Sequence, residues 1–291
     1  MKKIFCLVCC CISAALISCE KMPTIGNETD NDERNVVLTF EPTGRDLQTR
    51  GTAQVTQFTK LNVQMFDRQG AKVFDKVKSQ TADDEDFCQM ALKLTAGRYT
   101  IVAVGHSSAR AATINSPEDV RFTASDGEKL TDTFCHCSTI DIGGDSQSFS
   151  LPMYRAGAMI QFRLTDTEVP ESFAYFLMEY TGGSANFNPT TLEGITKSSQ
   201  SEKRIRNSLN LHQAFTFPYM AATGSLKMTV SGLDQEGTVI RKRTFEDVPV
   251  TRNRITTYTG KFFEDGDGVF TQSDFGFVVH SDWDGEQEFE F

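Results

Sequence analysis

The chain has few of the residues that enzymes and nucleic-acid-binding proteins depend on. Its 291 residues include one Trp, four His and eight Cys, and the formal net charge is −10. A nucleic-acid-binding domain needs a basic face, so an acidic chain gives no support for DNA or RNA as a partner. Beyond the N-terminal segment, no apolar run approaches the roughly 20 residues of a membrane-spanning helix. The 23 Phe residues and the moderate share of charged residues favour a globular, aromatic-packed protein body.

Patterns of catalytic and metal-binding residues are also missing. The turn Gly105–Ala109 follows a strand-like segment, as the nucleophile elbow of a hydrolase does. No helix follows it, however, and no acidic residue and His follow in the chain order that a catalytic triad needs. Glu264–Gly268 lacks the Asp-x-Asp-x-Asp-Gly order and the final Glu of a calcium loop. The run Arg241–Arg243 is too short for a nucleic-acid patch and is interpreted as the solvent face of a strand. We therefore expect no catalytic residue, no metal and no cofactor.

Three cysteines remain in the predicted body, namely Cys88, Cys135 and Cys137. Cys135 and Cys137 flank His136, which suggests a metal site at first sight. If this segment is a strand, however, the two thiols point to one face and the imidazole to the other, so they cannot share one metal ion. Two alternatives stay open: buried thiols, or one disulfide that joins Cys88 to one of the pair outside the cell.

The N-terminus has the pattern of a lipoprotein signal. Lys2 and Lys3 precede an apolar run from Ile4 to Ala15, which ends in Leu16-Ile17-Ser18-Cys19. Basic residues, a short apolar run and a small residue before the cut are the parts of a secretory signal. A Cys directly after Ser18 favours cleavage between the two and acylation of Cys19, for example by palmitate, which gives lasting membrane attachment when two or three chains are present. An ordinary secretory signal that is rich in Cys is the alternative.

The mature chain alternates polar and apolar residues with the period of two that is typical of half-buried strands. Leu61, Val63 and Met65 alternate with polar residues, and Ile160, Phe162 and Leu164 do the same. Turn residues separate about a dozen such segments, which predicts an all-β sandwich or barrel. Helical signal is restricted to Ser116–Val120 and Ser198–Ile205.

A break near Gly143–Pro152 divides the body into two halves of ordinary sandwich size. The predicted organisation is a signal peptide at 1–18, a lipidated flexible tether at 19–34, an N-terminal β-sandwich domain at 35–150 and a C-terminal β-sandwich domain at 151–291.

Several passages of the body together form a recognisable pattern; in chain order they are Thr49-Arg50, Leu61–Asp67 with Gly70, Leu94–Thr100, Val102–His106, Tyr154–Ala158, Asp247–Val250, Asn253–Gly260 and Trp283. In these passages the chain resembles the FimB-like family of fimbrial lipoproteins, the anchor and minor subunits of the type V pili of Bacteroidales. The resemblance covers most of the mature chain. It implies two tandem transthyretin-like β-sandwich domains after the lipoprotein signal peptide.

The resemblance also implies a function and a location. Subunits of such pili assemble by strand donation, in which a strand from a neighbour completes an open sheet. An anchor of this family keeps its lipid in the cell outer membrane, on the surface, and holds the base of the fimbrium, which serves cell adhesion. The implied partners are fimbrial subunits, outer-membrane lipid through Cys19, and a host or bacterial surface receptor through the fimbria.

Two other functions remain as alternatives. An arginine-specific protease that cut between Arg50 and Gly51 would release Cys19 together with the strand Val36–Phe40, as in a polymerising stalk or tip fimbrillin. The anchor hypothesis instead treats Arg50 as an exposed, uncut residue. A surface glycan-binding lipoprotein is the alternative of another class, but it needs exposed aromatic residues, and here most aromatics are Phe. The C-terminal segment with Phe289 and Phe291 alternates like a strand and is expected to close the protein's own sheet; entry into a neighbour's groove is the alternative.

Overall fold

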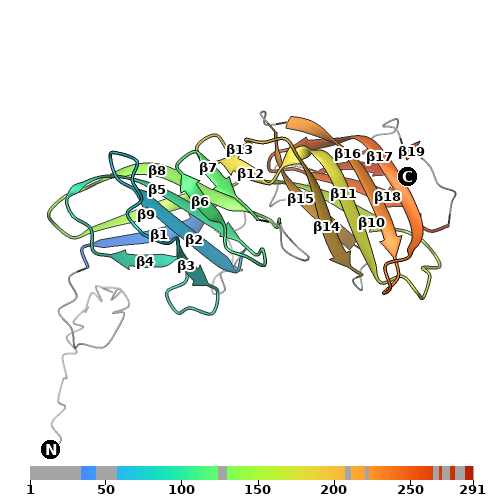
Figure 1. The fold of residues 1–291 in the computed structure, drawn as a ribbon, viewed down its shortest axis with the longest axis horizontal. Coiled ribbons are helices and arrows are strands. Elements are labelled where there is room, and N and C mark those ends of the chain that lie inside the picture. The colour runs from blue at the N-terminus through green and yellow to red at the C-terminus, as the bar shows by residue number, and fades with distance from the viewer. Residues whose placement is uncertain are drawn as a thin grey trace, which may run out of the picture. The chain divides into compact units, whose positions relative to one another are not determined.

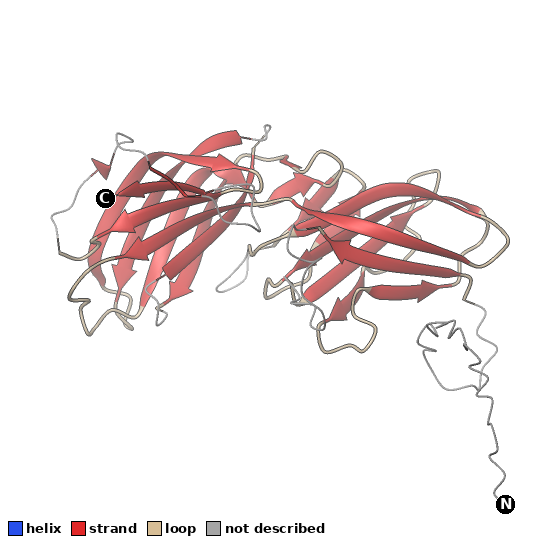
Figure 2. Ribbon diagram, turned by 180° about the vertical axis from the view of Figure 1, so that it is seen from behind, coloured by secondary structure: helices blue, strands red, loops and turns tan. Residues whose placement is uncertain are grey.

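The computed structural model describes residues 34–43, 58–123, 130–206, 211–219, 223–264, 269–270, 276–278 and 286–290. These residues form strands, turns and loops without any helix, which confirms the all-β class (Figure 2). None of the described segments is therefore a helix of the length and apolarity that a bilayer crossing requires. Residues 34–291 form one compact unit.

The first half of the chain forms a seven-stranded sheet in the order β3-β2-β5-β8-β9-β1-β4 (Figure 1). Strands β3, β2, β5 and β8 face strands β9, β1 and β4 across a shared apolar cluster, which we call the first core. The first core includes Leu38, Leu61, Ile101 and Met153, each fully buried. The strands are β1 (Val36–Pro42), β2 (Lys60–Phe66), β3 (Lys78–Thr81), β4 (Gln89–Leu92), β5 (Gly97–His106), β8 (Phe134–Ile142) and β9 (Gln147–Arg155).

The second half forms a ten-stranded sheet in the order β19-β17-β16-β11-β15-β10-β18-β21-β20, with β14 paired to β11. Its two layers enclose a second core with Phe162, Phe176, Met228 and Phe245. The strands are β10 (Ala158–Leu164), β11 (Tyr175–Ser184), β14 (Ser198–Ile205), β15 (Leu211–Pro218), β16 (Thr223–Leu233), β17 (Val239–Thr251), β18 (Ile255–Gly260), β19 (Val269–Phe270), β20 (Gly276–Val278) and β21 (Glu286–Glu290).

A small third sheet has the order β13-β12-β7-β6 and takes two strands from each half. Its strands are β6 (Thr113–Ser116), β7 (Asp119–Arg121), β12 (Asn186–Asn188) and β13 (Glu193–Gly194). A third apolar cluster, which we call the joint core, lies beside this sheet and also draws on both halves, for example through Phe122, Phe187 and Phe217.

The two large sheets repeat one arrangement. In the first, β1 pairs in parallel with β9, the last strand of its half. In the second, β10 pairs in parallel with β18. Each of these first strands also has an antiparallel neighbour, β4 for β1 and β15 for β10. The fold is therefore two tandem β-sandwiches, as expected.

Some details differ from the sequence-based expectation. The inward alternation of Leu61, Val63 and Met65 is confirmed, but Asn62 and Gln64 are buried as well, because the opposite face of β2 is also covered. The expected helical pieces are wrong: Ser116–Val120 lies in the β6–β7 hairpin, and Ser198–Ile205 is strand β14. The domain boundary at 150/151 remains a prediction; β9 runs through it, and the second sheet begins with β10.

Candidate functional site: the N-terminal strand and the sheet edges

Strand β1 lies in the interior of the first sheet, between β9 and β4. It pairs with β9 along its whole length from Val36 to Pro42 and with β4 over Val36–Thr39. Alternate side chains enter the first core, so that Val36, Leu38 and Phe40 are each no more than 2% exposed. β1 is thus an integral part of the sandwich, although it is the first strand of the chain.

Both ends of β1 are fixed by hydrogen bonds. At its start, Asn35 donates its Nδ2–H to the Leu94 carbonyl at 2.8 Å and accepts the Leu94 backbone N–H at 2.9 Å. The Asn35 backbone also bonds to Leu92 and Gln147. At its end, the backbone and the hydroxyl of Thr43 both donate to the Met153 carbonyl at 2.8 Å. The chain is therefore hydrogen-bonded to the first sheet from Asn35 onward, directly before β1 begins.

The edges of the first sandwich are closed by neutral polar side chains. A β-sandwich leaves backbone carbonyls unpaired where the edge strands of its two layers meet, and inward-pointing polar residues protect such edges. Gln80 of β3 donates its Nε2–H to the carbonyl of Gln89 in β4 at 2.6 Å. His136 of β8 contacts the Pro152 carbonyl of β9 through Nδ1 at 2.8 Å, where these two strands separate.

Buried arginines join the two layers of the second sandwich on both of its sides. Arg204 of β14 donates to the Gln213 carbonyl of β15, and its Nη1 lies 3.3 Å from Glu202 Oε2. On the opposite side of the second sandwich, Arg243 of β17 donates to the Phe262 carbonyl at 2.9 Å and to the Lys261 carbonyl at 2.8 Å, just after β18 ends.

The interpretation of Arg241–Arg243 as a solvent face was wrong for Arg243, which is 2% exposed, whereas Lys242 is exposed. The sequence also gave no reason to single out Gln80, Arg204 or Arg243. The signal that could have found them is a polar residue at an inward position of a strand.

The C-terminal strand lies in the protein's own second sheet. β21 pairs in parallel with β18 and antiparallel with β20. The expectation that this segment closes the chain's own sheet is confirmed for the backbone of residues 286–290. β18 is thereby flanked by β10 on one side and by β21 on the other.

The predicted lipidation and processing residues lie outside the described part of the chain. This holds for Ser18, Cys19, Arg50 and Gly51, and for the calcium-like segment after Glu264. Lipidation and proteolysis therefore stay predictions. The described segments on either side of residues 44–57 end at Thr43 and begin again at Phe58, which is buried in the first core.

The three cysteines of the body are free thiols. Cys135 lies in the joint core with Cys137 packed against it, whereas Cys88 packs against the first core on the other face of the sheet. His136 points away from the two thiols that flank it, so the predicted alternation along β8 is confirmed. Among the described residues, no three His, Cys, Asp or Glu side chains gather as a metal site would require.

The segment Gly105–Ala109 contributes to a buried network of polar side chains. His106 is fully buried, and its Nε2 lies 2.8 Å from Asn62 Oδ1, while its Nδ1 accepts the Ser108 backbone N–H at 3.1 Å. Both ring nitrogens are therefore engaged away from the Ser108 hydroxyl, which pairs with Thr131. Burial, reinforced by the nearby charge of Lys60, lowers the pKa of His106 to about 4. The geometry suits a structural role.

Comparison with known proteins gives likenesses of low identity. No curated protein matches the chain. Solved structures include proposed polysaccharide-binding proteins from Bacteroides thetaiotaomicron, with 10% identity, a TM-score of 0.45 and coverage of 73% of this chain and 79% of the other. A proposed adhesin from Bacteroides ovatus has 12% identity, a TM-score of 0.46 and coverage of 71% and 76%. The fimbrial anchor protein Mfa2 from Porphyromonas gingivalis has 14% identity, a TM-score of 0.38 and coverage of 72% and 81%.

The family model covers most of the chain. It matches residues 28–290 and is described as a family of unknown function, DUF6562. The match begins ahead of β1 and extends to the last residue of β21. The chain therefore belongs to the DUF6562 family.

Proposed function

We propose that this chain is a non-enzymatic outer-membrane lipoprotein that anchors a fimbrial polymer, or joins it at its base, and so serves adhesion. The observation that carries the proposal is the position of β1. The segment that follows the predicted lipid site at Cys19 leads directly into a strand that is paired on both sides and buried in the first core. Tension between membrane and fimbria would pass from the lipid into the interior of the first sandwich.

Strand donation supplies the assembly step of the proposal. Strand β1 is interior to its sheet and belongs to the chain's N-terminal end, so its removal would leave β9 and β4 with unpaired backbone groups and an open first core. An uncut anchor keeps β1 and presents a closed first sandwich. A polymerising subunit cut after Arg50 would lose β1 and would require a strand from a neighbour.

The described residues do not favour the glycan-binding alternative. Sugar-binding surfaces stack rings on exposed aromatic side chains. Among the large apolar side chains that are exposed in the described part of the chain, Tyr154 is the single aromatic, with 52% exposure. This single ring forms no stacking platform with other exposed rings of the described residues.

The mature N-terminus decides between the anchor and the stalk subunit. Intact-mass analysis of protein released from the cell surface should find a chain that begins at Cys19 and carries acyl chains. Finding only chains that begin at Gly51 would contradict the anchor proposal and support the stalk or tip alternative.

Retention of fimbriae tests the anchoring step. Cys19→Ala should release fimbriae from cells into the medium, because it removes the acylation site. Cys11→Ala makes the same chemical change within the predicted signal and should leave fimbriae attached. If cells with Cys19→Ala keep their fimbriae as well as the control, the anchoring function is wrong. Micromolar binding on a glycan array would instead favour the sugar-binding alternative.

A further inference from the structure

The connection between the two sandwiches contains more than the short linker that joins them. Two hairpins extend from the sandwiches: β6–β7 lies between β5 and β8 in the chain, and β12–β13 lies between β11 and β14. They meet as one sheet, with Asn186 opposite Arg121 and Phe187 opposite Val120. The Phe122 backbone N–H also donates to the Ala185 carbonyl at 3.1 Å.

The joint core fills the space beside this sheet with aromatic rings from both halves. Phe122 of the first half stacks on Phe217 of the second with ring centroids 5.9 Å apart, and Phe187 packs against Phe217 at 4.5 Å. All three side chains are buried, with Phe187 and Phe217 at 0% and 1% exposure. Linked domains move independently unless the interface between them is large and apolar, and these rings supply an apolar interface.

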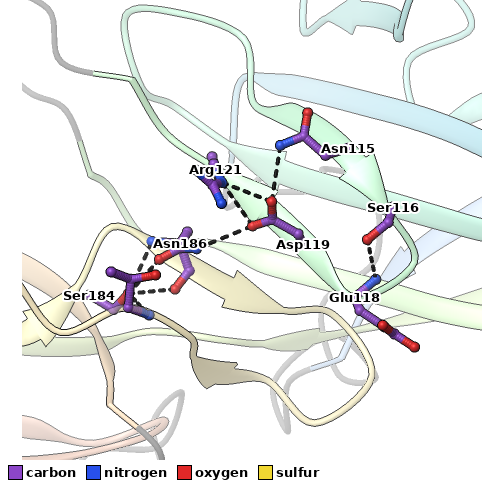
Figure 3. Close-up of polar contacts among 8 residues, drawn as sticks. Asn115, Ser116, Glu118, Asp119, Arg121, Ser184 and Asn186 are labelled. Atoms are coloured by element: carbon purple, nitrogen blue, oxygen red, sulfur yellow. Dashed lines mark hydrogen bonds and ion pairs between the residues drawn. The ribbon is translucent and has the colours of Figure 1, made fainter.

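A polar cluster covers the shared sheet (Figure 3). Asp119 of β7 accepts from Arg121 at 2.8 Å, from Asn115 at 3.0 Å, and from Asn186 of β12 at 3.2 Å. Burial acts to raise the pKa of Asp119, but the three donors outweigh it and hold the pKa below its ordinary value. On the second half, Ser184 donates to the Asn186 carbonyl at 2.6 Å, which fixes the residue that reaches across.

The linker between β9 and β10, Ala156 and Gly157, is hydrogen-bonded to both halves. Arg155 at the end of β9 forms a bidentate pair with Asp132 and donates to Asn253 Oδ1 of the second half at 3.1 Å. The Ala156 backbone N–H donates to the Thr133 carbonyl at 2.8 Å, and the Gly157 carbonyl accepts from the Asn253 N–H at 2.8 Å. Arg155 also lies over the Phe134 ring at 4.6 Å.

From these contacts we propose that the shared sheet and its joint core lock the two sandwiches into a single unfolding unit, so that neither opens independently of the other. The lock combines strand pairing, buried rings and charged hydrogen bonds, each with members from both halves. Cooperative units of this kind are recognised because their parts lose protection together.

A disulfide trap tests whether the hairpins meet in solution. Cys137 of β8 has its Sγ 3.5 Å from Thr190 Oγ1 in the β12–β13 turn. Thr190→Cys in the full mature chain should therefore form a crosslink with Cys137 at least tenfold faster than the matched control Thr191→Cys, which places a thiol one residue further on. Equal rates for the two variants would overturn the proposal.

Unfolding followed by hydrogen exchange tests the coupling. In the unmodified chain, peptides from β2 and from β16 should lose protection at the same urea concentration. Phe187→Ala should separate the two transitions, whereas Phe176→Ala, a substitution of the same kind in the second core, should lower both transitions together. Two separate transitions in the unmodified chain, or identical behaviour of the two variants, would overturn the proposal.

Discussion

At the scale of single residues, His212 makes stability depend on pH. It is 2% exposed, neither ring nitrogen has a hydrogen-bond partner, and its ring packs edge-on against Phe176 at 4.5 Å. Burial, with a smaller effect of the Arg206 charge, lowers the pKa of His212 from 6.5 to about 4. The unfolded chain therefore binds this proton first, and the stability held above pH 6.5 is lost as the pH falls from about 6.5 to about 4.

His212→Gln should flatten that loss, since Gln keeps a polar side chain but does not titrate. Between pH 6.5 and 4, the free energy of unfolding should fall by about 1 to 3 kcal/mol less than in the unmodified chain. Urea midpoints measured at several pH values check this. His212→Phe, which restores an aromatic ring, should reduce the loss of unfolding free energy between pH 6.5 and 4 in the same way. Slopes equal to that of the unmodified chain would show that His212 is not the titrating group.

The three thiols of the body give a second prediction at this scale. Burial raises the pKa of Cys88 to about 11 and also raises those of Cys135 and Cys137. Thiolates are the reactive form, so all three should react slowly with iodoacetamide in the folded protein. After unfolding in urea without reductant, mass spectrometry should count three alkylated body cysteines. A count of one would instead show that a disulfide joins two of the three, and peptide mapping would then test whether Cys88 is one of them.

At the scale of strands, the buried arginines of the second sandwich should be needed for its stability. Arg243→Met keeps the apolar stem but removes the donors to the carbonyls of Phe262 and Lys261. Leaving buried carbonyls unpaired should lower the free energy of unfolding by about 2 to 4 kcal/mol. It should also loosen the contact between β17 and the segment after β18, which faster hydrogen exchange of peptides from these two segments would detect. The matched control Lys242→Met, at an exposed neighbour, should change neither quantity.

These buried polar residues also explain where sequence reasoning succeeded and where it failed. The strands with Leu61 or Ile160 were predictable because their inward residues are apolar. β14 was not, because its inward positions are Gln200, Glu202 and Arg204, which hide the period of two behind uniform polarity. β6 and β7 are four and three residues long, too short for any periodicity to show. The edge-closing contacts depend on which strands become neighbours, which a single strand's pattern does not contain.

At the scale of the whole molecule, the position of β1 predicts how the chain responds to loss of its N-terminus. A chain that begins at Gly51 lacks Val36, Leu38 and Phe40, three side chains buried in the first core. At about 1.5 to 3 kcal/mol for each buried side chain, together with unpaired backbone groups on β9 and β4, the free energy of unfolding should fall by about 5 kcal/mol or more. Urea unfolding of this chain beside the chain from Cys19 measures the difference. Equal stabilities would mean that β1 is dispensable.

A synthetic peptide of residues 35–43 should restore part of that loss, because a ligand that binds only the folded state stabilises it by mass action. Rescue should rise with peptide concentration and should bring back the protection of β9 and β4 against hydrogen exchange. A control peptide with Leu38→Ser and Phe40→Ser keeps the backbone donors and acceptors but loses the side chains that fill the first core, so it should rescue far less. Equal rescue by both peptides would show that backbone pairing alone holds β1. No rescue by either would mean that the first sandwich cannot accept a strand once β1 is lost, and the stalk alternative would then lose its physical basis.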